Sequence, residues 1–194
     1  MSEVKPVGFC FRERMQGPLA AGVDDPKAGA AIGRRSATFF VADLKVSIDD
    51  LSACVRDPLH RARLNGTATF PGLATRQAIY DGELMMYVAD PVAGAKLMRY
   101  QFGFRGDDGK AYFLDGTKII HTPSASTREQ VTLYTRIHET KPGGPVWGAG
   151  VLVFRVRDLP AFLLSMRAAN ASRFRGLRTF LGFARQELAT PASL

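Results

Sequence analysis

Between residues 39 and 156 the chain repeats one pattern, and this pattern limits the folds open to it. Short runs in which apolar and polar residues alternate are separated by turn residues such as Gly, Asp and Pro. Alternation with a period of two places one set of side chains on a buried face, as in a half-buried β-strand. About eight such segments follow one another through short turns, which predicts a mainly antiparallel sheet.

The clearest alternation lies in residues 96–105, where Met98, Tyr100, Phe102 and Phe104 share one face. Residues 39–48, 129–138 and 146–156 predict further strands in the same way. Antiparallel strands of this number remove their exposed edges best by closing on themselves. We therefore expect a barrel or a strongly curved sheet.

Turn residues divide the strand region. The run 106–109 (GDDG) predicts a hairpin turn, and Asp115-Gly116 predicts another turn before residues 117–121. Asp81-Gly82 lies inside the apolar run 78–88 and predicts a tight turn or a bulge. Residues 122–128 read as a loop.

The flanking segments differ from the strand region. Residues 18–38 are rich in Gly, Ala, Asp and Pro without clear periodicity, which predicts a long loop. Asp49 and Asp50 are suited to cap a short helix that ends near Arg56. Asp158 is suited to begin a helical end over residues 158–188. An apolar stripe at helical spacing is expected there from Phe174, Leu177, Leu181, Ala184 and Leu188.

Together these features predict an α+β fold in a single domain over residues 1–194. The chain has 194 residues, 46% of them hydrophobic and 23% charged. These values are typical of a globular protein and exclude a disordered chain. No stretch is apolar enough for a signal peptide or a transmembrane helix, so we expect a cytoplasmic location.

The net charge of +8 is unevenly distributed. The last 44 residues hold seven Arg and two acidic residues, and the first 150 residues carry only +3. Arginine forms planar, bidentate contacts with phosphates and carboxylates, so this end is a candidate for docking on an anion or an acidic partner. A solvated helix face is the alternative. The docking candidates are Arg167, Arg173, Arg175, Arg178 and Arg185.

Familiar catalytic signatures are absent from the sequence. It contains no dinucleotide-binding, P-loop or nucleophile-elbow motif, and its two cysteines cannot form a metal site alone. We therefore expect no cofactor and no metal. If the strands 117–121 and 129–138 pair, His121 and His138 would become neighbours, and with Asp115 or Tyr134 they would form an acid–base pair.

The interior of an antiparallel barrel is a natural place for a ligand. Its predicted inward residues are large and apolar, which suits a fatty-acid-like or sterol-like molecule and equally suits a solid core. These residues are Met86, Tyr100, Phe102, Phe104, Leu133 and Ile137.

Several ordered motifs carry a family resemblance. They include FCFRERMQG at 9–17, DPLHRARLNGTATF at 57–70, MRYQFGFRGDDGKAYFLDGTK at 98–118 and FRGLRTFLGFARQEL at 174–188. In this order they resemble the accessory region of bacterial cholesterol-oxidase-like flavoproteins of the glucose–methanol–choline oxidoreductase group. The flavin-binding portion of such proteins is not in this sequence, so the resemblance implies an association with sterol or lipid metabolism and no oxidase activity.

Three functions follow from these observations. The leading expectation is a non-catalytic, lipid-associated module that binds an apolar ligand or docks on a lipid-metabolising enzyme, with peripheral contact to anionic membranes. The alternative is a small barrel enzyme that acts on a lipid or an aromatic molecule. Nucleic-acid binding ranks last, because it rests on the basic charge alone and no nucleic-acid-binding motif is present.

Overall fold

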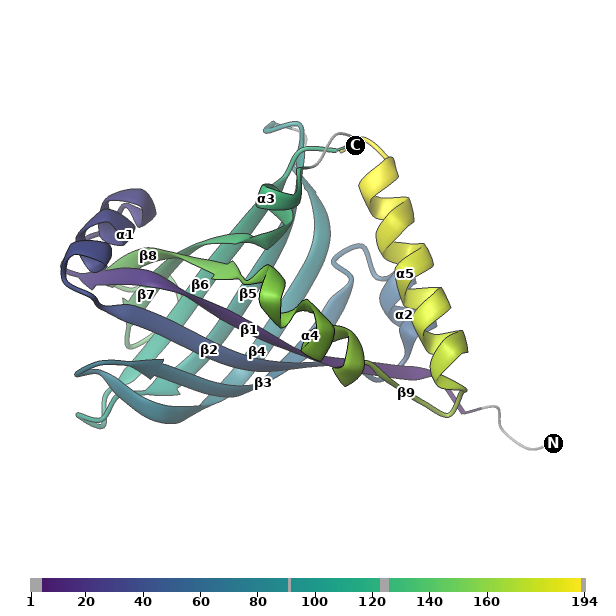
Figure 1. Cartoon of the computed structure of the whole chain (residues 1–194), viewed down its shortest axis with the longest axis horizontal. Helices are drawn as coiled ribbons and strands as arrows, with labels where there is room; N and C mark the ends of the chain where they lie inside the picture. The colour runs from purple at the N-terminus through teal and green to yellow at the C-terminus, as the bar shows by residue number, and fades with distance from the viewer. Residues whose placement is uncertain (1–4, 91, 123–125, 193–194) are drawn as a thin grey trace.

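A computed structural model describes residues 5–90, 92–122 and 126–192 of the chain. Eight antiparallel strands pair in chain order, and β1 pairs with both β2 and β8, which closes the sheet into a barrel (Figure 1). The predicted α+β fold with an antiparallel barrel is confirmed. The strands are β1 (Gly8–Ala21), β2 (Phe39–Ile48), β3 (Arg61–Phe70), β4 (Ala74–Asp90), β5 (Ala95–Arg105), β6 (Ala111–Ile120), β7 (Thr132–Glu139) and β8 (Val146–Phe154).

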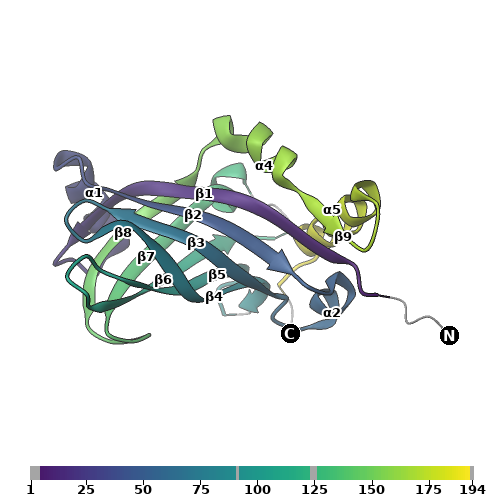
Figure 2. The ribbon, with the colours of Figure 1, turned by 90° about the horizontal axis from the view of Figure 1, so that it is seen from below.

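Short helices lie around the barrel. Helix α1 packs on β1 and β8 at one end, and α5 lies with α2 at the other end (Figures 1 and 2). A short strand, β9, extends the sheet by pairing with the start of β1. The remaining elements are α1 (Pro26–Arg35), α2 (Leu51–Arg56), α3 (Thr127–Val131), the 3-10 helix η1 (Val156–Asp158), α4 (Leu159–Ser165), β9 (Arg167–Ala169) and α5 (Arg173–Ala189).

The prediction of a long loop over residues 18–38 is wrong. Strand β1 continues to Ala21, and most of the remaining segment is α1. The Asp25 carboxylate accepts a hydrogen bond from the Ala28 N–H at 2.7 Å, and Pro26 occupies the first turn, where its missing N–H costs nothing. The Gly and Ala content that suggested a loop instead lets α1 lie close to the barrel.

The predicted turn at Asp115-Gly116 is also wrong, because β6 runs through both residues. A Cβ atom at Gly116 would lie 3.0 Å from the Leu133 side chain, so the glycine makes room for a core residue of the neighbouring strand. Asp81-Gly82 lies at a bulge of β4, where the register against β5 shifts. Asp81 has a φ of 48°, which bends the strand without ending it.

The segment between β6 and β7 differs from the predicted loop and strand. Residues 123–125 of the loop expected at 122–128 lie outside the described residues, and α3 occupies the positions after Ser126. Ser126 and Glu129 form a capping box, in which each side chain binds the backbone N–H of the other residue. Strand β7 therefore begins at Thr132 rather than at residue 129.

The capping predictions had mixed outcomes. The Asp50 carboxylate accepts hydrogen bonds from the N–H groups of Ser52 and Ala53, as expected for the start of α2. Asp158 precedes α4, but its side chain makes no capping hydrogen bond. The apolar stripe predicted for α5 is wrong, because Phe174 and Leu181 are exposed. The helix instead buries Gly176, Phe180 and Phe183.

The barrel interior divides into two parts. At the α1 end, aromatic side chains pack against one another and fill the interior, including the pairs Phe40–Phe104 and Tyr112–Trp147. Buried aliphatic residues such as Met15 and Leu114 complete this packing. At the α5 end the interior is less completely filled, and this end contains the candidate site.

Candidate functional site

A cavity of about 220 Å³ lies inside the α5 end of the barrel. Its wall combines inward residues of five strands with side chains from three helices. Most of the lining is apolar or aromatic, with one ion pair and one amide. The lining residues are Phe11, Glu13, Met86, Tyr87, Met98, Tyr100, Lys118, Ile120, Gln130, Val131, Phe154, Phe162 and Phe180.

A buried polar cluster of Glu13, Tyr100 and Lys118 forms part of this wall. The Lys118 ammonium donates to Glu13 Oε1 at 3.0 Å, and the Tyr100 hydroxyl donates to Glu13 Oε2 at 3.1 Å. The Lys118 ammonium also lies over the Tyr100 ring, 4.9 Å from its centre. Glu13 is 8% exposed and Lys118 is 3% exposed. Ionised groups this deeply buried require such partners.

Burial holds the Tyr100 hydroxyl in its protonated form. Loss of hydration raises its pKa well above 10, and the neighbouring Glu13 carboxylate raises the pKa further. The same two causes act on Tyr87, whose pKa rises to about 12 through burial and the charges of Glu187 and Glu13. Both phenols are therefore hydrogen-bond donors at neutral pH.

Strand periodicity explains how the cluster is assembled. Glu13 follows Phe9 and Phe11 on the inward side of β1, and Lys118 lies on the inward side of β6. These strands are not neighbours in the sheet, so the two side chains meet across the barrel interior. Tyr100 on β5 pairs in register with Gly116 on β6 and lies next to Lys118.

Helix α5 covers this end of the barrel through aromatic contacts. The ring of Phe180 stacks on Phe9 with ring centres 4.7 Å apart, and Phe183 meets Tyr87 edge to face at 5.8 Å. From α4, Phe162 contacts Phe11 at 5.2 Å. Each aromatic pair adds roughly 0.5–1.5 kcal/mol beyond the area that it buries.

A second ion pair, between the buried Lys96 and the partly exposed Glu187, holds the end of α5 against the barrel. The Lys96 ammonium donates to Glu187 Oε2 at 2.6 Å, to the Glu187 carbonyl at 2.8 Å and to Thr190 Oγ1 at 2.8 Å. Lys96 lies on β5 outside the cavity lining. We call these contacts the α5 latch.

All six residues predicted to face inward are buried in the core, but they differ in their relation to the cavity. Met86 and Tyr100 line it. The other four pack in the core outside its lining. They are Phe102, Phe104, Leu133 and Ile137. The sequence analysis did not identify Glu13 or Lys118 as site residues. Both nevertheless lie at inward positions of strands in which inward and outward residues alternate.

The predicted acid–base residues are dispersed. Strands β6 and β7 do pair, but their register places His138 opposite Phe113 at the α1 end, whereas His121 follows the other end of β6. The His138 ring nitrogen Nδ1 lies 2.8 Å from the Gly144 carbonyl, and Gln101 donates to Asp115 at 3.3 Å. The two histidines are therefore not neighbours.

His121 does have an acidic partner. Its Nδ1 lies 2.5 Å from Glu129 Oε1, and this hydrogen bond is the main reason that the pKa of Glu129 is lowered. His121 and Tyr134 line the same hollow of about 250 Å³. Among the described contacts, no hydrogen bond joins any two of His121, His138, Tyr134 and Asp115.

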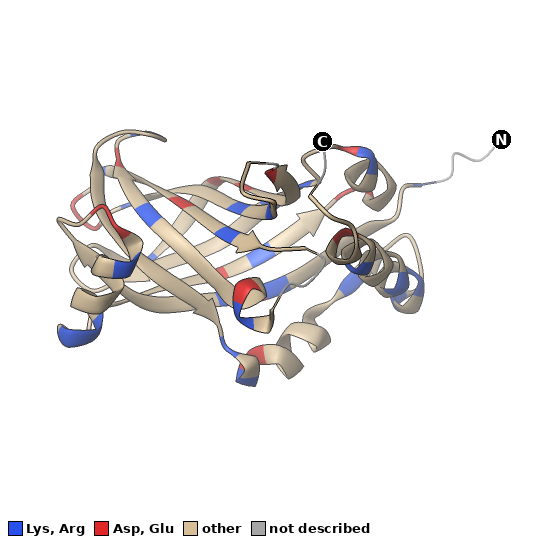
Figure 3. Ribbon diagram, turned by 90° about the horizontal axis from the view of Figure 1, so that it is seen from above, with Lys and Arg blue, Asp and Glu red and all other residues tan. Residues whose placement is uncertain are grey.

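The five docking arginines have two kinds of environment. Arg167 and Arg173 both donate to the Leu164 carbonyl near the end of α4, where helix carbonyls lack internal partners. Arg175, Arg178 and Arg185 are exposed on α5. Figure 3 shows these basic positions on α5 and others spread along the barrel strands.

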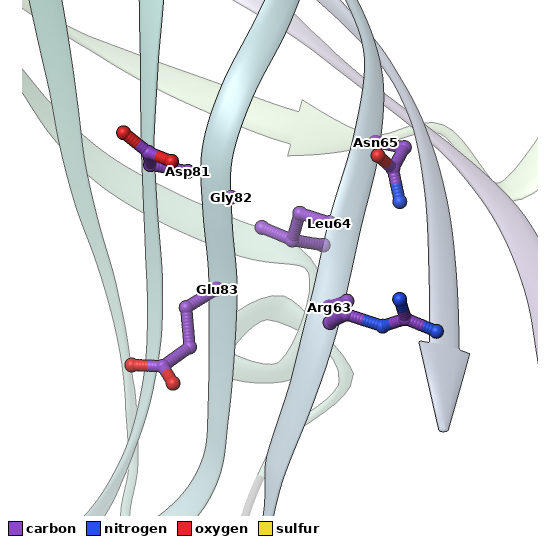
Figure 4. A pocket seen from close by; sticks show the side chains of 6 residues that line it. All are labelled: Arg63, Leu64, Asn65, Asp81, Gly82 and Glu83. Carbon is purple, nitrogen blue, oxygen red and sulfur yellow. The ribbon is translucent and has the colours of Figure 1, made fainter. Parts of the chain in front are cut away.

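Two further hollows lie on the outer surface. The first, of about 460 Å³, lies at the β3–β4 bulge, where Arg63 and Glu83 point away from each other (Figure 4). The second is an open groove of about 930 Å³ beside α4. Within the described ranges, no group of three or more His, Cys, Asp or Glu side chains is placed to hold a metal ion.

The fold and the cavity define the class of the molecule as a small, closed, eight-stranded antiparallel β-barrel with buried aromatic clusters. No family model, curated protein or solved structure matches the chain. None of the helices in the described part of the chain is both long and apolar enough to cross a bilayer.

Proposed function

We propose that the protein is a non-catalytic module that binds a small apolar molecule in the cavity beneath α5. The observation that carries this proposal is the cavity wall, which is largely aromatic and aliphatic around a single polar cluster. Ligand sites in proteins commonly combine a mainly apolar lining with a few fixed polar groups that orient the ligand. The resemblance to the accessory region of cholesterol-oxidase-like proteins supports a place in lipid metabolism.

The size of the cavity limits the size of the ligand that can bind. At about 220 Å³ it is smaller than the roughly 300–1,000 Å³ of pockets that take drug-sized molecules. A short-chain or single-ring compound fits this space. A whole sterol would require α5 to move, because Phe180 on that helix forms part of the wall.

Calorimetric titration with propylbenzene tests this function. A Trp at Met98 would occupy the cavity, so Met98→Trp should weaken binding by about tenfold or more. Phe39→Trp introduces the same residue at a partly exposed position outside the cavity and should leave binding unchanged. Native mass spectrometry of the expressed protein should show a retained small molecule. A bare mass together with no binding of propylbenzene would contradict the proposal.

A second proposed role is peripheral contact with anionic membranes through the outer surface of α4 and α5. Leu164 is 65% exposed on α4, and Phe174 is 84% exposed on α5. The two helices meet there, because Arg173 on α5 donates to the Leu164 carbonyl on α4. Apolar side chains beside cationic ones are typical of helices that lie in a membrane interface.

Vesicle co-sedimentation tests this second role. Near an anionic surface each Lys or Arg contributes about 1 kcal/mol, so Arg175→Ala/Arg178→Ala should weaken binding to phosphatidylglycerol vesicles by about tenfold or more. The matched control is Arg34→Ala/Arg35→Ala on α1, at the opposite end of the barrel. Equal losses from both pairs would indicate non-specific electrostatic binding, and either that result or no binding to vesicles would contradict this role.

A further inference from the structure

The charges around the cavity are balanced. Among the lining residues that the structure describes, Glu13 is the one acid and Lys118 the one base, and they neutralise each other. The other polar lining side chains, Tyr87, Tyr100 and Gln130, are uncharged, because burial keeps both phenols protonated. A ligand that enters the cavity therefore meets a neutral site with strong local dipoles.

The polar cluster has unused hydrogen-bonding capacity on Lys118. An ammonium group carries three donors, and the described contacts of Lys118 use one of them, toward Glu13. The Tyr100 ring covers another side of the ammonium group. Glu13 in turn accepts from both Lys118 and Tyr100. A ligand oxygen that accepts from Lys118 would complete the cluster.

We infer that the cavity selects uncharged apolar molecules that carry one oxygen acceptor, such as an alcohol or a ketone, over carboxylates of the same size. This inference rests on the proposed ligand-binding function. The oxygen accepts a hydrogen bond from the Lys118 ammonium, and the apolar remainder packs against Met86, Met98 and Phe180.

A carboxylate would upset the charge balance. It would place a second anion beside Glu13, and Lys118, the one cation among the described lining residues, would have to pair with both. A buried charge without its own partner is strongly unfavourable, whereas an uncharged oxygen adds no net charge. Hydrogen bonds that involve one charged group are also stronger than those between neutral groups.

Three probes with the same ring and alkyl chain separate these possibilities. They are propylbenzene, 4-propylbenzyl alcohol and 4-propylbenzoate, titrated into the unmodified protein at neutral pH by calorimetry. The alcohol should bind at least about tenfold more tightly than the benzoate. A benzoate that binds as tightly as the alcohol would overturn the inference.

The variant Glu13→Gln/Lys118→Met tests whether the polar cluster is responsible. Both charges are removed together, because deleting one would leave its partner buried and unpaired. The ratio of alcohol affinity to propylbenzene affinity should fall about tenfold, while propylbenzene still binds. The control, Arg61→Met/Glu83→Gln, removes an ion pair whose residues lie outside the cavity lining, and should keep the ratio.

The outcomes separate the inference from the proposed function. If propylbenzene binds and the ratio survives loss of the Glu13–Lys118 pair, the inference falls and the ligand-binding function stands. If none of the three probes binds, the inference falls, and the proposed function falls with it when native mass spectrometry also shows a bare mass. The comparison of the probes on the unmodified protein decides the inference even if the double variant does not fold.

Discussion

Asp107 is the residue on which the turn after β5 depends. Its carboxylate accepts hydrogen bonds from the Thr75 N–H at 2.9 Å, the Thr75 hydroxyl at 2.6 Å and the Gln77 amide at 2.6 Å. The hydrogen bonds from Thr75 are the main reason that the pKa of Asp107 lies below 3.8. One side chain thus ties this turn to the start of β4.

The variant Asp107→Asn should be less stable than the natural protein at neutral pH. Because the native fold favours the ionised form, the contribution of Asp107 is complete above pH 3.8 and is lost as the pH falls below this value. Urea unfolding midpoints should therefore differ at pH 7 and converge as the pH falls below the lowered pKa of Asp107. Asp24→Asn, at an exposed position, serves as the control. A difference that stays constant down to acidic pH would contradict this assignment.

At the scale of residues, the sequence predicted two of the residues that line the cavity, Met86 and Tyr100, and missed the rest of the lining, including its charged pair. Met86 and Tyr100 were found because large apolar residues alternate on their strands. Lys118 carries the same signal, since it follows Tyr112 and Leu114 at even spacing on β6. The turn wrongly placed at Asp115-Gly116 interrupted that spacing. The ion pair between Lys118 and Glu13 forms only because the barrel closes and brings β6 and β1 to face each other. The alternation within a single strand cannot predict such a contact.

At the scale of elements, two helical glycines differ in how closely their helix approaches its neighbours. A Cβ atom at Gly29 in α1 would lie 2.0 Å from the Ala149 carbonyl oxygen on β8, so the helix backbone touches the sheet. Gly182 in α5 has no atom within 4 Å of such a Cβ. The same substitution should therefore have opposite effects at the two positions.

We expect Gly29→Ala to destabilise the protein by about 1–3 kcal/mol, because α1 must move away from β8. Gly182→Ala should stabilise it by about 0.5–1 kcal/mol, because alanine is the better helix former and meets no obstacle there. Chemical denaturation of both variants measures the two values. Stabilisation by Gly29→Ala would show that α1 does not pack closely on β8.

The elements that sequence predicted well are those with a strong period and a recognisable cap. Strand β2 and helix α2 follow this rule, since Asp50 caps the helix as expected. Asp25 and Pro26 are residues typical of a helix start, and they indicate the beginning of α1. The helix was not recognised because its buried face consists of small residues, which give no clear apolar periodicity. In α5 the choice of the buried face depends on Phe9 and Phe11, which lie far away in the sequence.

At the scale of the whole molecule, the two ends of the barrel differ: one has a packed interior, and the other contains a cavity that α5 covers. Aromatic packing fills the α1 end, while the cavity end depends on α5 and its latch. Glu187→Gln leaves the Lys96 ammonium buried without its carboxylate, which typically costs about 3–5 kcal/mol. Hydrogen exchange of the α5 amides should therefore accelerate strongly, while strands β5 and β6 remain protected.

Glu83→Gln is the matched control for the latch. It removes one carboxylate of an exposed ion pair with Arg61, where the N–O distance is 3.7 Å. Exposed pairs contribute about 0–1 kcal/mol, so exchange in α5 should be unchanged. Equal acceleration in α5 and in the barrel strands would mean that α5 does not open as a separate unit.

Because β1 pairs with β8, the barrel cannot close until most of the chain has been synthesised. Strand β1 is made first, yet Met15 pairs with Phe154 on β8, near the other end of the sequence. Until β8 leaves the ribosome, β1 and β7 keep unpaired edges that are open to wrong partners. The Glu13 carboxylate likewise has no partner until Lys118 of β6 has been made, so in the nascent chain it is a hydrated acid and not one half of a buried ion pair.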